Sequence, residues 1–355
     1  RESRAKTVMD LSICCARAGA RKEFGIRGDA RVGANESARR LPATRPIWII
    51  RAAGVEKRHG GACARRRRPA GWRAPSDAAA MPLLAPTDDP DSLALIFGAI
   101  AVAAGVAGMD IYGRDAHARL KRDRSPVCDA DIAAEALIAQ RLRAVFGRLP
   151  IIAEEAASRG KRAAPGSDFL LIDALDGTRE FLARNGEFTL NIALARDHAP
   201  VAGAVFAPAS HRLWGAGRQA RACRVAPGAP LPAPSEWRDL AVRRAPAAGL
   251  TALVSRSRED AEAEALLARL PIAERRAAGS SLKFCLIAEG EADVYPRFGR
   301  TMEWDTAAGD AILRAAGGCV LDPQGRRLAY GKTASAYANG PFVAWGDRAA
   351  AATLC

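Results

Sequence analysis

The sequence lacks the cysteine and histidine patterns that build disulfide frameworks and zinc sites. Its eight cysteines include no C-x-x-C pair, and its four histidines are equally scattered along the 355 residues. Scattered cysteines are typical of reduced thiols in a cytosolic protein, and we therefore expect a cytoplasmic chain. Carboxylates then remain as the plausible ligands for any metal ion.

The sequence also has no internal repeat and no clear membrane span. Residues 93–109 are apolar, but they fall somewhat short of the ~20 residues that a span needs, and Ala and Gly dominate them. Asp88, Asp89 and Asp91 precede this run, which is the wrong charge for a signal peptide. We therefore predict a buried first helix and no transmembrane segment.

The positive charge of the chain belongs mainly to its first part. The formal net charge is +14, but residues 1–80 hold 19 of the 53 Lys and Arg against 7 of the 39 Asp and Glu. We expect residues 1–80 to be a disordered extension, or a stretch translated from an upstream start, and residues 81–355 to form the folded domain. Nucleic-acid binding by the basic tail is the alternative. We expect no nucleic acid as main partner, because the rest of the sequence lacks a basic, aromatic-laced surface.

Helical and strand-like patterns alternate in the second part. Short apolar runs such as residues 169–172 alternate with stretches of helical spacing such as residues 305–316. This alternation predicts a layered α/β protein. Residues 226–250 are rich in Pro and Ala, and they connect two halves that we assign to residues 81–225 and 250–345.

The stretch D-A-L-D-G-T at residues 173–178 follows a buried strand pattern and carries two carboxylates, Asp173 and Asp176. Gly177 permits a tight turn and close approach of a ligand to the backbone. Two carboxylates beside the free N–H groups of a starting helix suit a hard cation that bridges to a phosphate. A capped turn without a ligand explains this stretch alone about equally well.

Three further acids stand at the ends of predicted elements. Asp131 and Asp305 lie at predicted helix starts, and Glu154 follows a short strand pattern. Helix capping would explain the two aspartates, with either Asp129 or Asp131 as the cap of its helix, and solvation would explain Glu154. Successive strand residues point to opposite faces, so only one of Glu154 and Glu155 should enter a site. Five acids around one turn nevertheless favour a metal site.

Two stretches resemble the signatures of a known family. D-A-L-D-G-T (173–178) and W-D-T-A-A-G-D-A-I-L-R-A-A-G-G (304–318) are similar to the motifs of the inositol monophosphatase superfamily of metal-dependent, lithium-sensitive phosphatases. The resemblance covers roughly residues 90–345. It implies a layered α/β/α/β/α sandwich of the type shared with fructose-1,6-bisphosphatase.

Further stretches resemble the branch that acts on 3'(2'),5'-bisphosphate nucleotides, the CysQ type. They are S-P-V-C-D-A-D-I-A-A-E (125–135), R-E-F-L-A-R-N-G-E-F-T-L-N-I-A-L (179–194), G-S-S-L-K-F-C-L-I-A-E-G (279–290) and Y-P-R-F-G (295–299). This resemblance implies a Mg²⁺-dependent phosphatase that converts adenosine 3',5'-bisphosphate to AMP, a reaction linked to sulfate assimilation.

The resemblance also implies metal ligands. Glu154, Asp173 and the Leu175 carbonyl would hold a first metal ion, and Asp173, Asp176 and Asp305 would surround a second.

Catalytic and phosphate-binding roles follow from the same resemblance. Asp131 and Thr178 would polarise the attacking water, with the metal ligand Glu154 as the third catalytic residue. The N–H groups of Gly177 and Thr178 would cradle the phosphate, which also lies against Asp305. Lys121 matches a lysine near the metal site. The chain departs from the family pattern at three other positions, which are Cys128, Ala153 and Ala174.

A second anion site is predicted from Ser280, Lys283 and Arg297. Ser280 and Lys283 are three residues apart at a predicted helix start near Ser281, and Arg297 ends the next strand. Inositol-type members generally place an acidic residue where Arg297 stands, whereas an arginine suits a second phosphate. The alternative is an inositol-1-phosphate or broad sugar-phosphate phosphatase, with Arg297 in a surface ion pair. The sequence leaves open the oligomeric state and a peripheral contact with the inner membrane.

Overall fold

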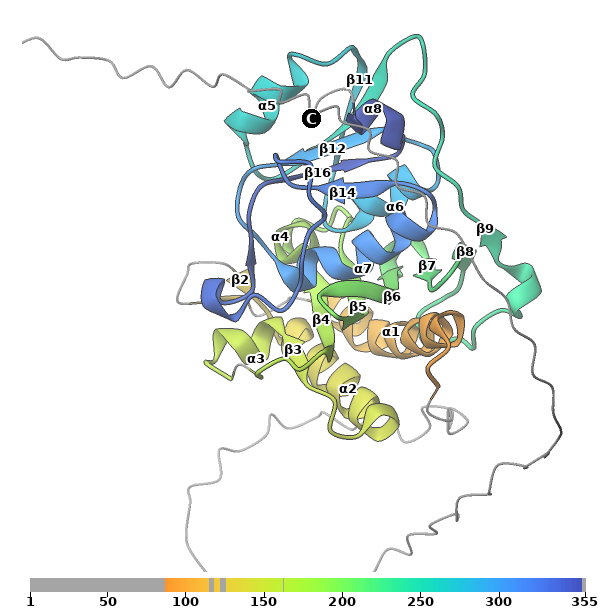
Figure 1. The fold of residues 1–355 in the computed structure, drawn as a ribbon. Coiled ribbons are helices and arrows are strands. Elements are labelled where there is room, and N and C mark those ends of the chain that lie inside the picture. The colour runs from red at the N-terminus through yellow and green to blue at the C-terminus, as the bar shows by residue number, and fades with distance from the viewer. Residues whose placement is uncertain (1–86, 115–117, 122–125, 162, 353–355) are drawn as a thin grey trace, which may run out of the picture. The chain divides into compact units, whose positions relative to one another are not determined.

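The computed structural model describes residues 87–114, 118–121, 126–161 and 163–352. The prediction for residues 1–80 lies outside the described residues. Within the described part, helices and sheets alternate in five layers, from α5 and α8 at the top of Figure 1 to α1 and α2 at the bottom. The predicted α/β/α/β/α sandwich is therefore confirmed.

The larger sheet has seven strands in the order β3-β4-β5-β6-β7-β8-β9. β3 and β4 run parallel, and every other neighbouring pair is antiparallel. β4, β5 and β6 are buried along almost their whole length, because helices cover both faces. The strands are β3 (Ile151–Ala153), β4 (Asp168–Asp176), β5 (Thr189–Arg196), β6 (Ala199–Ala207), β7 (Arg212–Ala216), β8 (Ala220–Arg224) and β9 (Arg238–Asp239).

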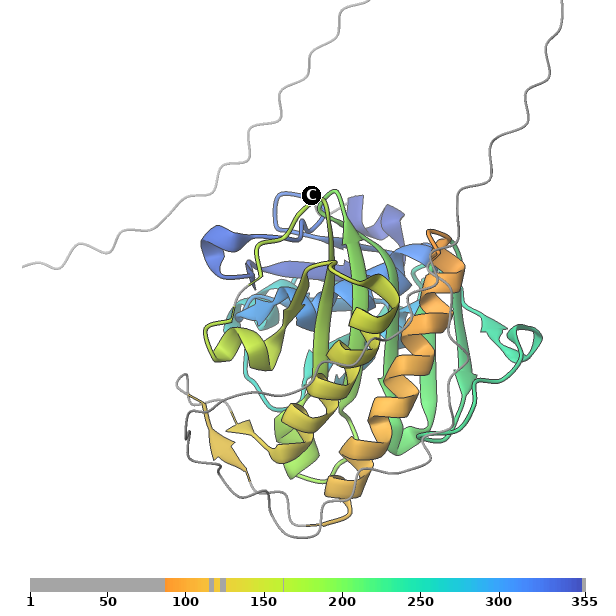
Figure 2. The same cartoon turned by 90° about the horizontal axis from the view of Figure 1, so that it is seen from below.

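Helices α1 (Pro90–Tyr112) and α2 (Asp129–Phe146) cover one face of this sheet (Figure 2). α1 is long and apolar enough to cross a membrane by length and composition alone, but most of its apolar window is buried within the molecule. It packs against β5, β6 and β7, as a core helix does, and this confirms the prediction of a buried first helix. Asp89 caps it by accepting a hydrogen bond from the Ser92 N–H at 3.0 Å.

Helices α6 (Leu282–Ala288) and α7 (Glu303–Ala315) form the middle layer, between the two sheets. α7 contacts β4 to β8 on one side and β14 on the other, and nearly all of its residues are buried. The helix ends at Ala316, where Gly317 follows with a φ of +104°. Glycine suits this terminating position, since L-residues rarely adopt such a φ.

The smaller sheet has five strands in the order β11-β10-β12-β16-β14. β10 is parallel to β11 and β12, whereas β16 is antiparallel to β12 and β14. Helices α5 (Ala261–Leu267) and α8 (Arg348–Ala352) pack on its outer face. The strands are β10 (Leu250–Ser255), β11 (Ile272–Ala278), β12 (Val294–Arg297), β14 (Cys319–Leu321) and β16 (Phe342–Trp345). Our division of the folded domain into residues 81–225, with the metal site, and residues 250–345, with the substrate site, stays a prediction.

Short elements lie at the ends of the main strands and helices. Two of them, α3 (Glu154–Ser158) and α4 (Thr178–Leu182), follow β3 and β4 directly. The others are the strand pairs β1 (Arg119–Leu120) with β2 (Pro126–Val127) and β13 (Thr301–Met302) with β15 (Ala338–Asn339), together with three single 3-10 turns, η1 (Pro208–Ser210), η2 (Pro234–Glu236) and η3 (Thr333–Ser335).

One local prediction was wrong, and one alternative does not hold. Cys128, and not Asp129 or Asp131, is the N-cap of α2, while Asp131 sits in the first turn and accepts the Cys128 N–H at 2.8 Å. Glu154 begins the helix α3 and is not a solvated strand end. Asp131, in the first turn of α2, satisfies the free N–H of the N-cap residue Cys128. Glu154, the first residue of α3, faces a pocket. The sequence reveals neither arrangement.

Candidate active site

The candidate site is a pocket of about 450 Å³ where β3, β4, α6, α7 and β12 meet. Both signs of charge line it, which is the arrangement expected for cations and phosphate groups held together. Its acids are Glu154, Asp173, Asp176, Glu180 and Asp305, and its cations are Lys121, Arg179, Arg258, Lys283, Arg297 and Arg300.

A bulge at the end of β4 brings Asp173 and Asp176 to the same face of the sheet. In a regular strand, residues three apart point to opposite faces. Here Asp173 pairs with Asn191 and Asp176 pairs with Thr189, so three steps on β4 match two steps on β5. Because of this extra residue, both carboxylates point to the same face of the sheet. Oδ1 of Asp173 accepts the Leu175 N–H inside the bulge at 3.0 Å.

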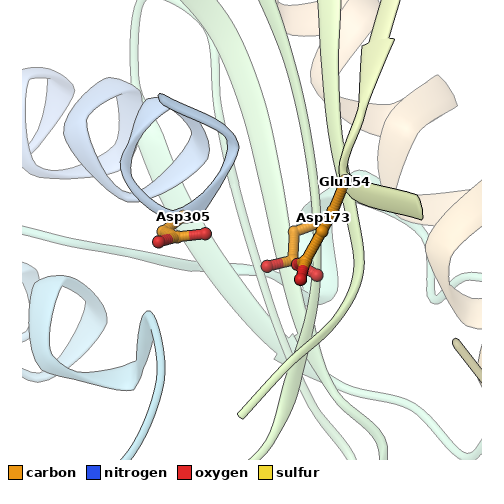
Figure 3. Close-up of side chains that lie close together, drawn as sticks. All are labelled: Glu154, Asp173 and Asp305. Carbon is orange, nitrogen blue, oxygen red and sulfur yellow. The ribbon is translucent and has the colours of Figure 1, made fainter. Parts of the chain in front are cut away.

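Three carboxylates converge beside this bulge. Glu154 and Asp173 lie together at the ends of β3 and β4, and Asp305 faces them from the first turn of α7 (Figure 3). Each offers one oxygen, and these three oxygens all lie within 4.8 Å of one another. The group could hold a metal ion, and its all-oxygen chemistry suits a hard divalent cation.

Burial makes these carboxylates costly to ionise. It raises the pKa of Asp173 well above its usual range, and the charges of Glu154 and Asp176 add to the effect. Burial likewise raises the pKa of Asp305 well above its usual range, again with Asp176 and Glu154 as like charges. A bound cation would reverse this by favouring the ionised forms, so the donor set fits a metal.

Asp176 lies beside these three carboxylates and is tied to the start of α6. Its Oδ2 accepts hydrogen bonds from the N–H and the hydroxyl of Ser281, at 2.6 and 2.9 Å. The Asn191 side chain approaches the same oxygen at 3.4 Å and donates to the Ser281 hydroxyl at 2.9 Å. One carboxylate oxygen therefore fixes α6 to β4, and the other is left for the pocket.

Asp131 and Thr178 are joined, as the resemblance implies. The Thr178 hydroxyl lies 3.1 Å from Oδ1 of Asp131 and 3.4 Å from the Leu175 carbonyl oxygen. Oδ2 of Asp131 accepts from the Cys128 thiol at 2.8 Å. Asp131 is thus held from both sides, by the Cys128 thiol and by the Thr178 hydroxyl.

Lys121 forms ion pairs with both Glu154 and Glu155. Its Nζ lies 2.5 Å from Oε1 of Glu154 and 2.5 Å from Oε1 of Glu155. Burial disfavours the ammonium, but the two carboxylates outweigh it and raise the pKa of Lys121. Of the glutamate pair, only Glu154 lines the pocket, while Glu155 is buried with its N–H donating to Glu135. This confirms that one member of the pair enters the site.

The predicted anion-binding residues lie in the same pocket. Lys283 is buried and donates to the carbonyl oxygens of Ala278 and Ser280, at 3.1 and 2.7 Å. Burial lowers the pKa of Lys283 to about 8. Arg297 is only 5% exposed, and its Nε has no hydrogen-bond partner among the described residues. The alternative of a surface ion pair for Arg297 does not hold, because this side chain is buried.

Ser280 differs from the expectation in its backbone. It precedes α6 and adopts a φ of +45°, so it does not share a helical face with Lys283. Its side chain lies against the adjoining strand, with the Thr189 hydroxyl 3.3 Å from its own. Ser280 still lines the pocket, beside Gly177.

Comparison with known proteins decides the family. A model of the inositol monophosphatase family matches residues 89–354. The chain belongs to the inositol monophosphatase family. Enzymes of this family are metal-dependent, in agreement with the carboxylate group of Glu154, Asp173 and Asp305.

Several relatives of this chain are described as the same enzyme. The chain is 41% identical over 210 residues to the 3'(2'),5'-bisphosphate nucleotidase CysQ of Escherichia coli K12. This match covers 59% of this chain and 81% of the relative. The chain is 40% identical over 229 residues to the protein of the same description from Escherichia coli O157:H7, covering 64% of this chain and 89% of the relative.

Solved structures of the family share the fold. CysQ from Bacteroides thetaiotaomicron superposes with a TM-score of 0.61 at 34% identity, over 73% of this chain and 98% of that one. Mycobacterium tuberculosis SuhB superposes with a TM-score of 0.56 at 21% identity, over 76% and 96%. The second similarity bears on the fold alone.

Some residues of the site had no functional role in the sequence analysis. Asn191 and Ser281 bind Asp176, and Asp260 lies next to Arg297. Thr189 and Asn191 alternate on one strand, and this pattern could have indicated that Asn191 points into the site. The link of Asp260 to the backbone beside Arg297 gave no signal, because that backbone lies almost forty residues away along the chain.

Proposed function

We propose that this chain is a 3'(2'),5'-bisphosphate nucleotidase that hydrolyses the 3'-phosphate of adenosine 3',5'-bisphosphate to give AMP and phosphate. The main support for this proposal is that one pocket contains both the carboxylate group and the buried Arg297. The Nε of Arg297 has no hydrogen-bond partner among the described residues. The descriptions of the relatives at about 40% identity support the same reaction. The enzyme would act on a small nucleotide in the cytoplasm.

The cofactor in this proposal is Mg²⁺. Glu154, Asp173, Asp176 and Asp305, with the Leu175 carbonyl, offer the oxygen ligands that Mg²⁺ prefers. Bound Mg²⁺ would neutralise charge on the phosphate and make a water molecule more nucleophilic.

Asp131 and Thr178 would orient the attacking water in this proposal. The Thr178 hydroxyl has two protein acceptors, Asp131 and the Leu175 carbonyl, so its proton is directed away from the pocket. A free lone pair of that hydroxyl can then accept a hydrogen bond from water and increase its nucleophilic character. Glu154 is the third catalytic residue, since it lies in the carboxylate group.

The phosphate being cleaved would lie against the backbone of Gly177 and Thr178, with Asp305 on its other side. A side chain at position 177 would approach the Glu187 carbonyl oxygen to 3.1 Å and Ser280 to 3.3 Å, so glycine keeps this backbone open. Ser280, Lys283 and Arg297 would bind the 5'-phosphate, which an inositol monophosphate does not have.

Charge reversal at Arg297 tests this assignment. Arg297→Glu should lower kcat/KM for adenosine 3',5'-bisphosphate by about 10²-fold, the scale of a lost charged hydrogen bond plus repulsion. The loss should be much smaller for adenosine 3'-phosphate, which has the same nucleoside but no 5'-phosphate. Both substrates are measured on both proteins at fixed Mg²⁺.

Arg300→Glu is the matched control. Arg300 lines the same pocket but is exposed, so solvent screens its charge and the two substrates should change little and alike. Equal losses on both substrates for Arg297→Glu would contradict the proposal. A wild-type enzyme that prefers inositol-1-phosphate would favour the alternative of an inositol or sugar-phosphate phosphatase.

A further inference from the structure

The Arg297 guanidinium is buried, and no carboxylate of the described residues lies within direct hydrogen-bond distance of it. The nearest carboxylate is that of Asp260, whose Oδ2 lies 3.9 Å from NH1. A full ion pair would place these atoms about 2.8 Å apart. The charge of Arg297 and its unpaired Nε therefore remain to be satisfied from elsewhere.

Asp260 is kept at this distance by other hydrogen bonds. Its Oδ2 accepts the N–H groups of Phe298 and Gly299, both at 2.8 Å. Its Oδ1 caps α5 by accepting the Ala263 N–H at 3.1 Å. Burial opposes the charge of Asp260, but these three N–H groups and Arg297 together lower the pKa of its carboxyl. Asp260 thus joins α5 to the backbone that follows Arg297.

Gly299 lies against the same guanidinium. A Cβ at this position would lie 3.3 Å from both Cζ and NH2 of Arg297, closer than ordinary van der Waals contact. The bare backbone of Gly299 therefore packs against the guanidinium. Asp260 fixes that same backbone through the Gly299 N–H.

We propose that Asp260 is a positioning residue that, together with Gly299, sets the guanidinium of Arg297 for the second phosphate of the substrate. This inference rests on the proposed function. Asp260 touches no substrate group itself. It acts by anchoring the Phe298–Gly299 backbone. At 3.9 Å it is also too far from Arg297 to form a hydrogen bond, so the N–H groups of the guanidinium stay available for a phosphate. Discrimination between a bisphosphate and a monophosphate would then depend on α5, outside the metal site.

Asp260→Asn separates anchoring from helix capping. Asparagine is as good an N-cap as aspartate, so its oxygen can keep the Ala263 N–H. Its NH₂ group would then face the N–H groups of Phe298 and Gly299 and release them. We expect KM for adenosine 3',5'-bisphosphate to rise about tenfold with little change in kcat, and adenosine 3'-phosphate to be affected less than twofold.

The matched control is Asp89→Asn, which makes the same change at the N-cap of α1, remote from the pocket. It should alter neither KM. A loss of activity on both substrates for Asp260→Asn, in parallel with a lower Tm, would mean that Asp260 has a purely structural role and would overturn the inference.

A double-mutant cycle distinguishes this inference from the proposed function. Arg297→Met keeps the apolar stem and removes the guanidinium, and once it is made, Asp260→Asn should cause no further rise in KM for the bisphosphate. If Arg297→Met has no selective effect on the bisphosphate, the second-phosphate assignment fails and the inference with it. If Arg297→Met is selective but Asp260→Asn is not, or if their effects simply add, only the inference fails.

Gly299→Ala gives an independent check. The new methyl group should displace the flexible guanidinium and raise KM for the bisphosphate severalfold, with adenosine 3'-phosphate unaffected. Gly340→Ala is the control, because a Cβ there meets nothing within 4 Å. Unchanged discrimination in Gly299→Ala would count against the packing of Arg297 on Gly299.

Discussion

At the scale of single residues, Asp176 shows how one carboxylate can serve two purposes. Its Oδ2 holds the N–H and hydroxyl of Ser281, which fixes the start of α6 against the end of β4. The remaining oxygen belongs to the pocket and, in our proposal, to the metal. In that proposal the charge of Asp176 is needed for catalysis, whereas its hydrogen-bonding oxygen holds the start of α6 in the fold.

Asp176→Asn should separate these purposes. The amide oxygen can still accept from Ser281, and removing a charge relieves repulsion with Asp173 and Asp305, so folding should survive. Turnover should fall by at least ~10³-fold at saturating Mg²⁺, comparable to losing a main electrostatic stabiliser. Steady-state kcat and Tm are the measurements.

Ser281→Ala is the control for this prediction, because it removes the hydroxyl contact to Asp176 and leaves the charge in place. It should lose far less activity than Asp176→Asn. More than a tenth of wild-type turnover in the Asn variant would show that Asp176 is not a metal ligand.

At the scale of elements, the end of β4 organises the site. The bulge aligns Asp173 with Asp176, and Gly177 then turns the chain into α4 with a φ of +92°. Because Gly177 lies between Asp176 and Thr178, any displacement of its backbone moves a proposed ligand and a proposed catalytic hydroxyl together.

Gly177→Ala should therefore damage activity more than stability. The positive φ costs about 1–3 kcal/mol for a residue with a side chain. The added Cβ would also press on the Glu187 carbonyl oxygen at 3.1 Å, which should move the turn and lower kcat by at least about tenfold. Denaturant unfolding and kcat would be measured in parallel.

Gly160→Ala provides the comparison, since Gly160 has a φ of +80° but a Cβ added there would meet nothing within 4 Å. It should show the backbone cost alone, with normal turnover. If both variants lost equal stability and neither lost activity, the turn at Gly177 would have no part in placing the site.

The same element shows how far sequence reasoning could go. The strand around residues 169–172 was predicted correctly, because a continuous apolar run reveals burial on both faces. The bulge in β4 was not predicted, since register depends on the partner strand and not on the strand itself. β8, β14 and β16 were not predicted either.

The composition of the site was easier to predict than its local geometry. The acids and cations proposed from motifs all lie in or beside one pocket, apart from Asp131, which reaches it through Thr178. The αL backbone of Ser280 and the partnership of Asp260 with Arg297 were missed. Both depend on which distant segments meet, and neither changes a periodic pattern in the sequence.

At the scale of the whole molecule, the carboxylate group should make stability depend on pH and metal together. Unfolded Asp and Glu have pKa values near 4. In the fold, the pKa of Asp173 and that of Asp305 are raised, so the folded protein binds more protons than the unfolded chain above that pH. Without metal, the contribution of these two groups to stability should therefore fall as pH rises above about 4, until the pH reaches their raised pKa values.

This predicts that, from these groups, the Tm of chelator-treated protein is lower at pH 8 than at pH 5, and that it recovers on adding Mg²⁺. Binding at 100 times Kd would add about 2.7 kcal/mol to the free energy of unfolding. Asp173→Asn should raise the Tm of the metal-free protein at pH 8 and abolish the Mg²⁺ effect. A wild-type Tm that does not respond to Mg²⁺ would contradict the proposed metal site.

The convergence of Glu154, Asp173 and Asp305 also has a consequence for folding kinetics. These residues come from β3/α3, β4 and α7, so their oxygens meet only after both halves of the described chain have packed together. Contacts of such high sequence separation form late, and ligands that need them stabilise the native state more than the transition state. A divalent ion should therefore slow the unfolding of this protein and leave its folding rate nearly unchanged.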